Sequence, residues 1–220
     1  PSHRHSDLLS FVLYYKSKPI LIDVGRLSYN NPTGQYGYSA QAHNSITIDD
    51  FEAQAGINNR KLPDFYRTSI VDTDYFVDEE KFILTIEHNG FQRLFGDPIA
   101  HKRIFTLSNT YFKIEDQLLG KKKHKLKTFF HWAPGMSIIQ NEDSSLSIDY
   151  NNIKNHKSIL RLETKSSEFE SSKTEIYHGS SSGYGWHFPN YGIKEAITTL
   201  IYSQDINLPM TNYFKLEWEV

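Results

Sequence analysis

Apolar and polar residues alternate at every second position through most of this sequence, and that alternation most constrains the fold. It recurs in short runs rich in β-branched and aromatic residues, such as KFILTIEH (81–88), YFKIEDQLL (111–119) and NYFKLEWEV (212–220). A period of two places alternate side chains on opposite faces of a strand. Turn signals such as NPTG, HNG, NEDSS and GSSSG separate the runs. Because strands do not alternate with helices, the pattern predicts an all-β fold, a large antiparallel β-sandwich.

Two local predictions follow from the first quarter of the chain. LLSFVLYY (8–15) and PILIDVG (19–25) are expected to form a hairpin across a turn at residues 16–19. DDFEAQAGINN (49–59) is the one helix candidate, limited to a turn or two because Gly56 and the asparagine pair end it. We therefore expect few or no helices.

Length and charge narrow the classes of function. The 220 residues suit one large domain, which we place over residues 1–220. With 24 basic and 26 acidic residues the net charge is -2, which argues against nucleic acid as a partner. No apolar run approaches the roughly 20 residues of a membrane span. Cysteine is absent, so thiolate chemistry is excluded. Because the chain opens at Pro1 and runs directly into a dense motif, we expect it to be a piece of a longer protein.

Polar groups with metal-binding chemistry gather near the start of the chain. SHRHSD places two histidines and an aspartate at alternate positions, a second aspartate ends the apolar run PILI, and QAHNS holds a third histidine. These candidates are His3, His5, Asp7, Asp23 and His43. Imidazole and carboxylate are the usual zinc ligands where cysteine is absent. The alternative is that Asp23 caps the turn at Gly25 while the histidines lie on the surface.

The predicted hairpin creates a geometric difficulty for such a site. A tight turn sets Asp23 opposite about residue 12, whereas His5 on a straight strand would lie roughly 23 Å from that point. The site can form only if the SHRHSD segment leaves the strand and folds back.

The stretches HRHSDLLSFVLYYKSKPILIDVGRLSYN and YSAQAHNSITID resemble the heparinase II/III-like family of polysaccharide lyases. The family pattern joins H-x-H-x-D, an apolar strand, G-x-P-L-x-x-D-P-G-x-x-x-Y and A-H-N-T-V-x-V-D. Here Val24 replaces a proline and Ser45 a threonine of that pattern. Looser similarity continues through IEHNGFQRL, FFHWAP and GYGWHFPNYGIKEAITTLIYS. The resemblance implies the family's C-terminal β-domain, a supersandwich-like arrangement of antiparallel strands.

The resemblance also implies roles for individual residues. A zinc ion, or another divalent cation, would be held by His5, Asp23 and His43. Relatives with the same spacing do form this site, so the resemblance implies that the SHRHSD segment folds back here as well. The catalytic candidates are His3, which would face the substrate uronate, and Tyr29, which would exchange a proton. Tyr36 and Tyr38, in the glycine-rich loop before AHN, are candidates for substrate binding. Outside this region, His88 and Trp186 are weaker candidates for a glycan cleft, and His131 is expected to be satisfied inside the core.

The implied reaction is β-elimination on an acidic, uronic-acid-containing polysaccharide of the glycosaminoglycan or alginate kind. In relatives the base-side groups come largely from an N-terminal helical toroid, which this sequence does not contain. We therefore expect the β-domain of a lyase, with a zinc site and one wall of the cleft, inactive alone and partnered by the helical domain. A periplasmic or secreted bacterial location is expected.

Two other classes of function stay open. One is a non-catalytic carbohydrate-binding or scaffold domain of a polysaccharide-biosynthesis protein. The other is a zinc hydrolase, which would need a second general base that the sequence does not offer.

Overall fold

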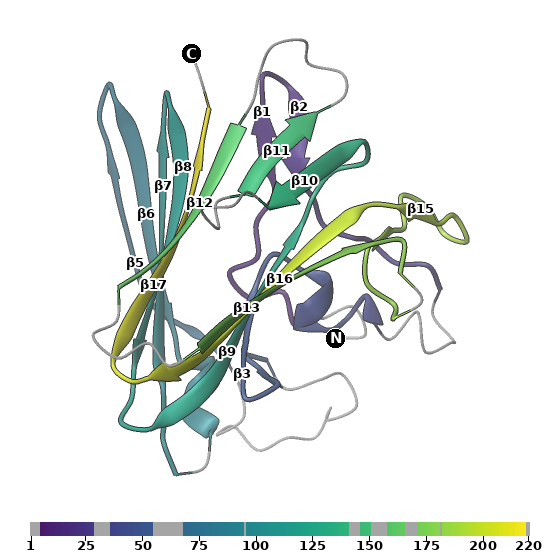
Figure 1. Cartoon of the computed structure of the whole chain (residues 1–220). Helices are drawn as coiled ribbons and strands as arrows, with labels where there is room; N and C mark the ends of the chain where they lie inside the picture. The colour runs from purple at the N-terminus through teal and green to yellow at the C-terminus, as the bar shows by residue number, and fades with distance from the viewer. Residues whose placement is uncertain are drawn as a thin grey trace. The chain divides into compact units, whose positions relative to one another are not determined.

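The computed structural model describes residues 5–28, 36–54, 68–94, 96–140, 146–150, 158–165, 171–180 and 182–218. Strands dominate it, and paired neighbours run antiparallel (Figure 1). Its helical elements include two 3₁₀ turns, η1 (Ala40–Ala42) and η3 (Gly90–Arg93). The prediction of an all-β, antiparallel fold of the β-sandwich class is confirmed. No described helix has the length and apolarity needed to cross a bilayer.

The chain forms two compact units, each assembled from three stretches of sequence. The first comprises Pro1–Arg67, Lys125–Met136 and Glu170–Asp205, and the second Thr68–His124, Ser137–Phe169 and Ile206–Val220. The single domain predicted over residues 1–220 stays a prediction.

A five-stranded sheet in the order β13-β16-β9-β3-β4 organises the first unit. Its strands are β3 (Ile46–Ile48), β4 (Phe51–Glu52), β9 (Lys123–His131), β13 (Ser171–His178) and β16 (Thr198–Asn207). Two hairpins accompany it, β1 (Leu13–Tyr15) with β2 (Lys18–Leu21) and β14 (Trp186–His187) with β15 (Glu195–Ala196). Fully buried apolar side chains fill its core, among them Ile46, Ile48, Leu126, Phe129, Trp132 and Leu200.

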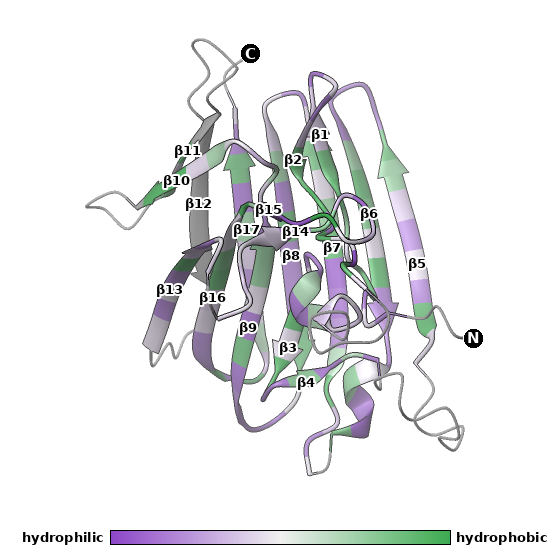
Figure 2. Ribbon diagram, turned by 90° about the vertical axis from the view of Figure 1, so that its right-hand side faces the viewer, coloured by the Kyte–Doolittle hydropathy of each residue, from purple (hydrophilic) through white to green (hydrophobic). Residues whose placement is uncertain are grey.

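The second unit contains an eight-stranded sheet in the order β10-β11-β12-β17-β8-β7-β6-β5. Its strands are β5 (Ile70–Val77), β6 (Lys81–His88), β7 (Ala100–Ser108), β8 (Tyr111–Leu119), β10 (Met136–Gln140), β11 (Leu146–Tyr150), β12 (Ser158–Lys165) and β17 (Met210–Glu217). Buried and partly exposed residues alternate strictly along β8 and β17, as the period-two pattern predicts. Figure 2 shows bands of hydrophilic and hydrophobic residues along β9 of the first unit, where the alternation ends in four consecutive buried residues.

Two hairpin turns share one backbone device. Lys16 and Ser17 (φ 48° and 62°) join β1 to β2, and Asp49 and Asp50 (φ 51° and 63°) join β3 to β4. Two successive residues with positive φ match the right-handed twist of the strands they connect. The predicted β1–β2 hairpin is confirmed. The helix predicted from residue 49 is wrong where it is described, because a left-handed turn and a strand occupy residues 49–52.

A buried polar network crosses three strands of the second unit. The Nε2 atom of His88 lies 2.7 Å from Nδ1 of His101, and Nε2 of His101 lies 2.7 Å from a carboxyl oxygen of Asp116. The guanidinium of Arg103 donates to both oxygens of that carboxylate, at 2.6 and 2.9 Å. All four side chains are buried, so the charges of Arg103 and Asp116 compensate each other away from water. The sequence-based suggestion that His88 lines a cleft is therefore wrong.

The donors in this network fix the protonation of both imidazoles. The amide of Gly90 donates to Nδ1 of His88 at 3.0 Å, so the proton of that ring lies on Nε2 and points to His101. The second ring accepts it at Nδ1 and donates from Nε2 to Asp116. Burial and the neighbouring His101 lower the pKa of His88 to about 2.

Stability should therefore fall as the pH drops below the ordinary histidine range. Burial also lowers the pKa of His131, in the first unit, to about 3. Below about pH 6.5 the unfolded chain binds protons at these rings and the folded chain does not. Each ring should remove about 2 kcal/mol from the free energy of unfolding between pH 7.5 and pH 5.0. Urea unfolding at several pH values measures this.

The variant His88→Gln tests the assignment to that ring. Lacking a titrating group, it should show a shallower loss of stability with falling pH than the parent chain. His178→Ala, at an exposed ring, is the matched control and should leave the dependence unchanged. Equal stability of the parent chain at pH 5.0 and 7.5 would contradict the prediction.

Candidate functional site

The leading segment leaves the first hairpin and folds back. Leu9 has a positive φ of 59°, and the amide of Ser10 donates to the carbonyl of Asp7 at 2.9 Å, which closes a tight turn. The Ser6 amide donates to the carbonyl of Tyr38 at 2.8 Å, and its hydroxyl donates to Glu52 at 2.6 Å. These contacts hold the segment against residues far along the chain.

The fold-back brings the metal candidates together. The ring centroids of His5 and His43 lie 5.5 Å apart. Nδ1 of His43 lies 2.6 Å from Oδ2 of Asp23. The His43 side chain is 1% exposed and the Asp23 side chain 45% exposed, so the carboxylate is open to water and the ring is not.

The Asp23 carboxylate is held in its ionised form. Burial of its surroundings would raise the pKa, but the hydrogen bonds from His43 and from the Gly25 amide, at 2.9 Å, outweigh it and the pKa lies below the usual value. His43 therefore donates from Nδ1. Among the described residues, its buried Nε2 atom has no hydrogen-bond partner. An imidazole oriented by a carboxylate, with bonding capacity left over, is typical of metal sites.

Gly25 allows a close approach beside this pair. Its φ is 71°, and a Cβ atom there would lie 2.4 Å from the carbonyl oxygen of Phe188. The Phe188 amide donates to the carbonyl of Val24 at 2.7 Å. Glycine at this position therefore lets the β14–β15 hairpin run directly beside the turn that carries Asp23.

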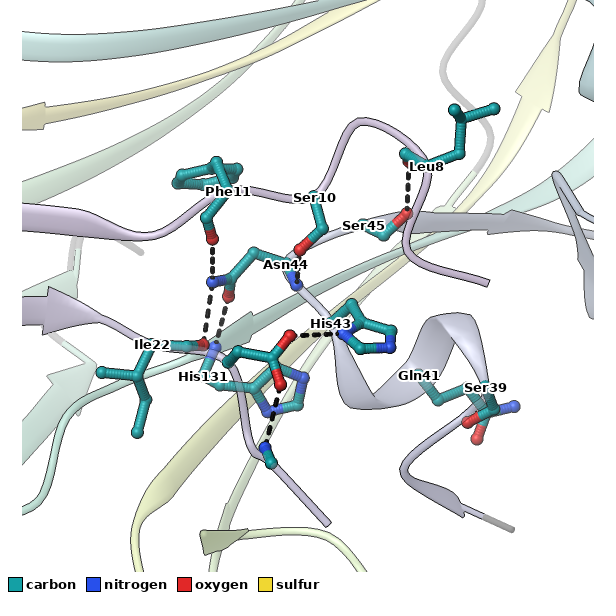
Figure 3. A network of polar contacts seen from close by, with 12 residues as sticks. Leu8, Ser10, Phe11, Ile22, Ser39, Gln41, His43, Asn44, Ser45 and His131 are labelled. Carbon is teal, nitrogen blue, oxygen red and sulfur yellow. Dashed lines mark hydrogen bonds and ion pairs between the residues drawn. The ribbon is translucent and has the colours of Figure 1, made fainter. Parts of the chain in front are cut away.

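Asn44, which follows His43, fastens three segments to one another (Figure 3). Its side-chain NH₂ donates to the carbonyls of Phe11 and Ile22, at 2.7 and 3.0 Å. Its side-chain oxygen accepts from the amide of His131 at 2.8 Å. The side chain is buried and uses donors and acceptor together, so it sets the mutual positions of the fold-back, Asp23 and β9.

The His131 ring lies fully buried near the Asp23–His43 pair (Figure 3). Its Nδ1 atom is 3.0 Å from the hydroxyl of Thr199, which also accepts from the amide of Gly185 at 3.2 Å. His131 was expected to be a core residue with its hydrogen bonds satisfied, and this holds for Nδ1. Sequence reasoning gave this ring no place near the site.

An aromatic ring and a cation flank His5. The Tyr38 ring meets the His5 ring edge-on, with centroids 4.8 Å apart, and the Arg26 guanidinium lies 3.8 Å from the centroid of Tyr38. Burial, then the His43 ring, lower the pKa of His5, and Arg26 acts in the same direction. His5 is thus held neutral, the form that binds metals.

The other predicted residues divide into two groups. Tyr36 donates from its hydroxyl to the carbonyl of Gln41 at 3.0 Å, and burial raises its pKa, so its phenol is held as a structural donor. The two catalytic candidates, His3 and Tyr29, lie outside the described residues.

The sequence matches the pattern of the heparinase II/III-like, C-terminal family over residues 1–216. The chain belongs to this family. No curated protein matches it. The motifs in the first fifty residues and the match over residues 1–216 thus agree on one family, whose C-terminal domain this chain contains.

Solved structures of heparinases share the fold. The heparan sulfate lyase HepC from Pedobacter heparinus matches with a TM-score of 0.73 at 11% identity, over 98% of this chain and 31% of its own. The heparinase III BT4657 gene product gives 0.72 at 14% identity, over 99% and 31%, and another heparinase III gives 0.69 at 13%, over 99% and 30%. The chain spans about a third of the length of these structures, and the likeness concerns the fold alone.

The side chains of His5, Asp23 and His43 have the chemistry of metal ligands, but the distances between them match those of a zinc site only in part. No group of three or more histidine or acidic side chains among the described residues is already arranged as a metal site. Two imidazoles on one tetrahedral zinc ion have ring centroids about 5 Å apart, close to the 5.5 Å between His5 and His43. Two ligand atoms on such an ion lie about 3.3 Å apart, against 2.6 Å between His43 and Asp23. These two atoms would therefore have to move apart for both to hold one ion.

Asn44→Ala should destabilise the chain strongly. It removes three side-chain hydrogen bonds and leaves two carbonyls and one amide without those bonds, at about 1 kcal/mol or more each, so we expect a loss of about 3 kcal/mol or more. Urea unfolding measures it. Asn190→Ala, at an exposed asparagine, is the control and should stay within about 0.5 kcal/mol of the parent. A similarly small effect of Asn44→Ala would show that the amide does not fasten the site.

Proposed function

We propose that this chain is the β-domain of a polysaccharide lyase that cleaves uronic-acid-containing acidic polysaccharide by β-elimination. The observation that carries the proposal is the convergence of His5, Asp23 and His43 in a member of the heparinase II/III-like family. The similar solved structures include a heparan sulfate lyase and a heparinase III, which supports a lyase acting on an acidic glycan.

β-Elimination sets clear demands on the residues around a uronate. A base removes the C5 proton, a donor or cation stabilises the charge on the carboxylate, and an acid protonates the C4 oxygen as it leaves. We assign His3 and Tyr29 to the catalytic roles on the resemblance alone. The neutral His5 ring lies between the rings of Tyr38 and His43.

His5, Asp23 and His43 would hold a zinc ion or another divalent cation. Its chemistry there would be a fixed positive charge that fastens the folded-back segment to the sheet. The residues already present prepare this role, because Asp23 is ionised and the ring of His43 is oriented toward it. If Nδ1 of His43 were to hold such an ion, the proton that it donates to Asp23 would have to move to Nε2 of the same ring.

The first test is metal binding by the purified 220-residue chain. After chelator treatment, calorimetric titration and metal analysis should show one zinc ion per chain. His5→Ala, Asp23→Asn and His43→Ala should each weaken binding by about 100-fold or more, and zinc should raise the melting temperature of the parent only. His178→Ala, at an exposed ring, is the control and should bind as the parent does. A chain that binds no zinc, or variants that bind normally, would refute the site.

The second test is turnover. Heparan sulfate and alginate are incubated with the 220-residue chain, and unsaturated uronate products are followed by ultraviolet absorbance. We expect little or no signal, because the base-side groups belong to a helical domain in the related lyases. The same assay on a longer form that includes such a domain should show product. Robust activity of the 220-residue chain alone would overturn this division of labour, and an inactive longer form would overturn the lyase proposal.

A further inference from the structure

Two cations lie on aromatic rings in adjoining segments beside the candidate metal residues. The Arg26 guanidinium lies 3.8 Å from the centroid of the Tyr38 ring, and the Lys194 ammonium lies 3.6 Å from the centroid of the Trp186 ring. A ring beneath a cation limits the conformations of a long side chain and adds favourable electrostatics. Both cations are thus held in place before any ligand binds.

Backbone contacts place the two cation-bearing segments next to each other. The Phe188 amide donates to the carbonyl of Val24 at 2.7 Å, and the Gly192 amide donates to the carbonyl of Leu27 at 3.0 Å. Gly25 and Phe188 also form a parallel bridge. The loop of the β14–β15 hairpin therefore runs along the segment that contains Arg26.

Packing fixes the stem of Arg26 as well as its head. Its Nε donates to the carbonyl of Ser28 at 3.0 Å. A Cβ atom on Gly37 would lie 3.0 Å from the carbonyl oxygen of Gly25 and 3.5 Å from two stem carbons of Arg26. The backbone at Gly37 thus lies directly against this side chain, which keeps the guanidinium over Tyr38.

The acidic groups of the two segments already have partners. Asp23 binds His43 and the Gly25 amide, and Glu195 lies 2.6 Å from Nδ1 of His187. Lys194 is exposed, and no carboxylate pairs with it among the described residues. Lys194 therefore carries a positive charge that no carboxylate among the described residues neutralises.

We propose that Arg26 and Lys194, each supported by its aromatic ring, form an anion-binding strip that receives the carboxylate groups of an acidic polysaccharide beside His5. The inference rests on the proposed function for its choice of ligand. A planar guanidinium suits two-pronged pairing with a carboxylate, and the rings offer apolar surface to the faces of sugars. Arg26, the nearer of the two to His5, would hold the uronate at the cleft, and Lys194 would hold the chain farther along.

The test is calorimetric binding of hexasaccharides from heparan sulfate and from alginate to the 220-residue chain, with maltohexaose as the neutral probe. Arg26→Gln and Lys194→Gln should each raise the Kd for the acidic probes about 5-fold, and the double variant about 20-fold. Arg26→Lys keeps the charge but loses the planar group and should give an intermediate value. Binding of the parent should weaken as salt is raised.

Lys16→Gln is the matched control, since Lys16 is another exposed lysine over an aromatic ring, 5.1 Å from the centroid of Tyr15, in the β1–β2 turn. It should bind within 2-fold of the parent. The melting temperatures of all variants are compared. If Arg26→Gln fails to fold, Arg26→Lys takes its place.

The inference is overturned if the parent binds no acidic hexasaccharide, if it binds maltohexaose equally well, or if both glutamine variants bind like the parent. Each titration is repeated with chelator and with zinc. Arginine-dependent binding without any lyase activity in a longer form would sink the proposed function and leave the strip standing. Lyase activity of the longer form, with binding that does not depend on Arg26, would overturn the strip and leave the proposed function standing.

Discussion

One side-chain amide, that of Asn44, joins three stretches of chain that the sequence keeps far apart. It binds the carbonyls of Phe11 and Ile22 and the amide of His131, and it neighbours the His43 ring. Together with the contacts of Ser6 to Tyr38 and Glu52, this junction holds the folded-back segment near Asp23, from which a straight hairpin would separate it by several times the length of a side chain. The candidate site is thus a product of long-range hydrogen bonding more than of strand pairing.

The two units treat buried polar groups differently. In the second unit the network from His88 to Arg103 satisfies each nitrogen of its two imidazoles, as expected of a structural core. In the first unit, Nε2 of His43 is buried without a hydrogen-bond partner among the described residues. Unused bonding capacity beside an ionised carboxylate is a common mark of a site that binds something.

The strands were predictable because the alternation of apolar and polar residues at every second position can be seen directly in the sequence. The β1–β2 hairpin and most strands of both sheets followed from it. The short helix at residue 49 was wrong because composition does not reveal two aspartates with positive φ. β10 was not predicted because two adjacent isoleucines interrupt the alternation in its sequence, MSIIQ.

The site was predictable in its residue types and not in its geometry. Motif chemistry pointed to His5, Asp23 and His43, but their approach depends on contacts such as Ser6 with Glu52, which no local pattern encodes. The AHN motif contains Asn44, but the sequence alone assigned this residue no structural role. Arg26 and Lys194 escaped notice because a cation over a ring leaves no spacing signal.

The chain of hydrogen bonds from His88 through His101 to Asp116 has a spectroscopic consequence. Both Nε2–H groups are sealed from solvent and each is committed to one acceptor. Their hydrogens should exchange slowly enough to give persistent, well-separated resonances in nitrogen-correlated NMR spectra. In a ¹⁵N-labelled sample those two signals would report the integrity of the eight-stranded sheet, with no chemical probe attached to the chain.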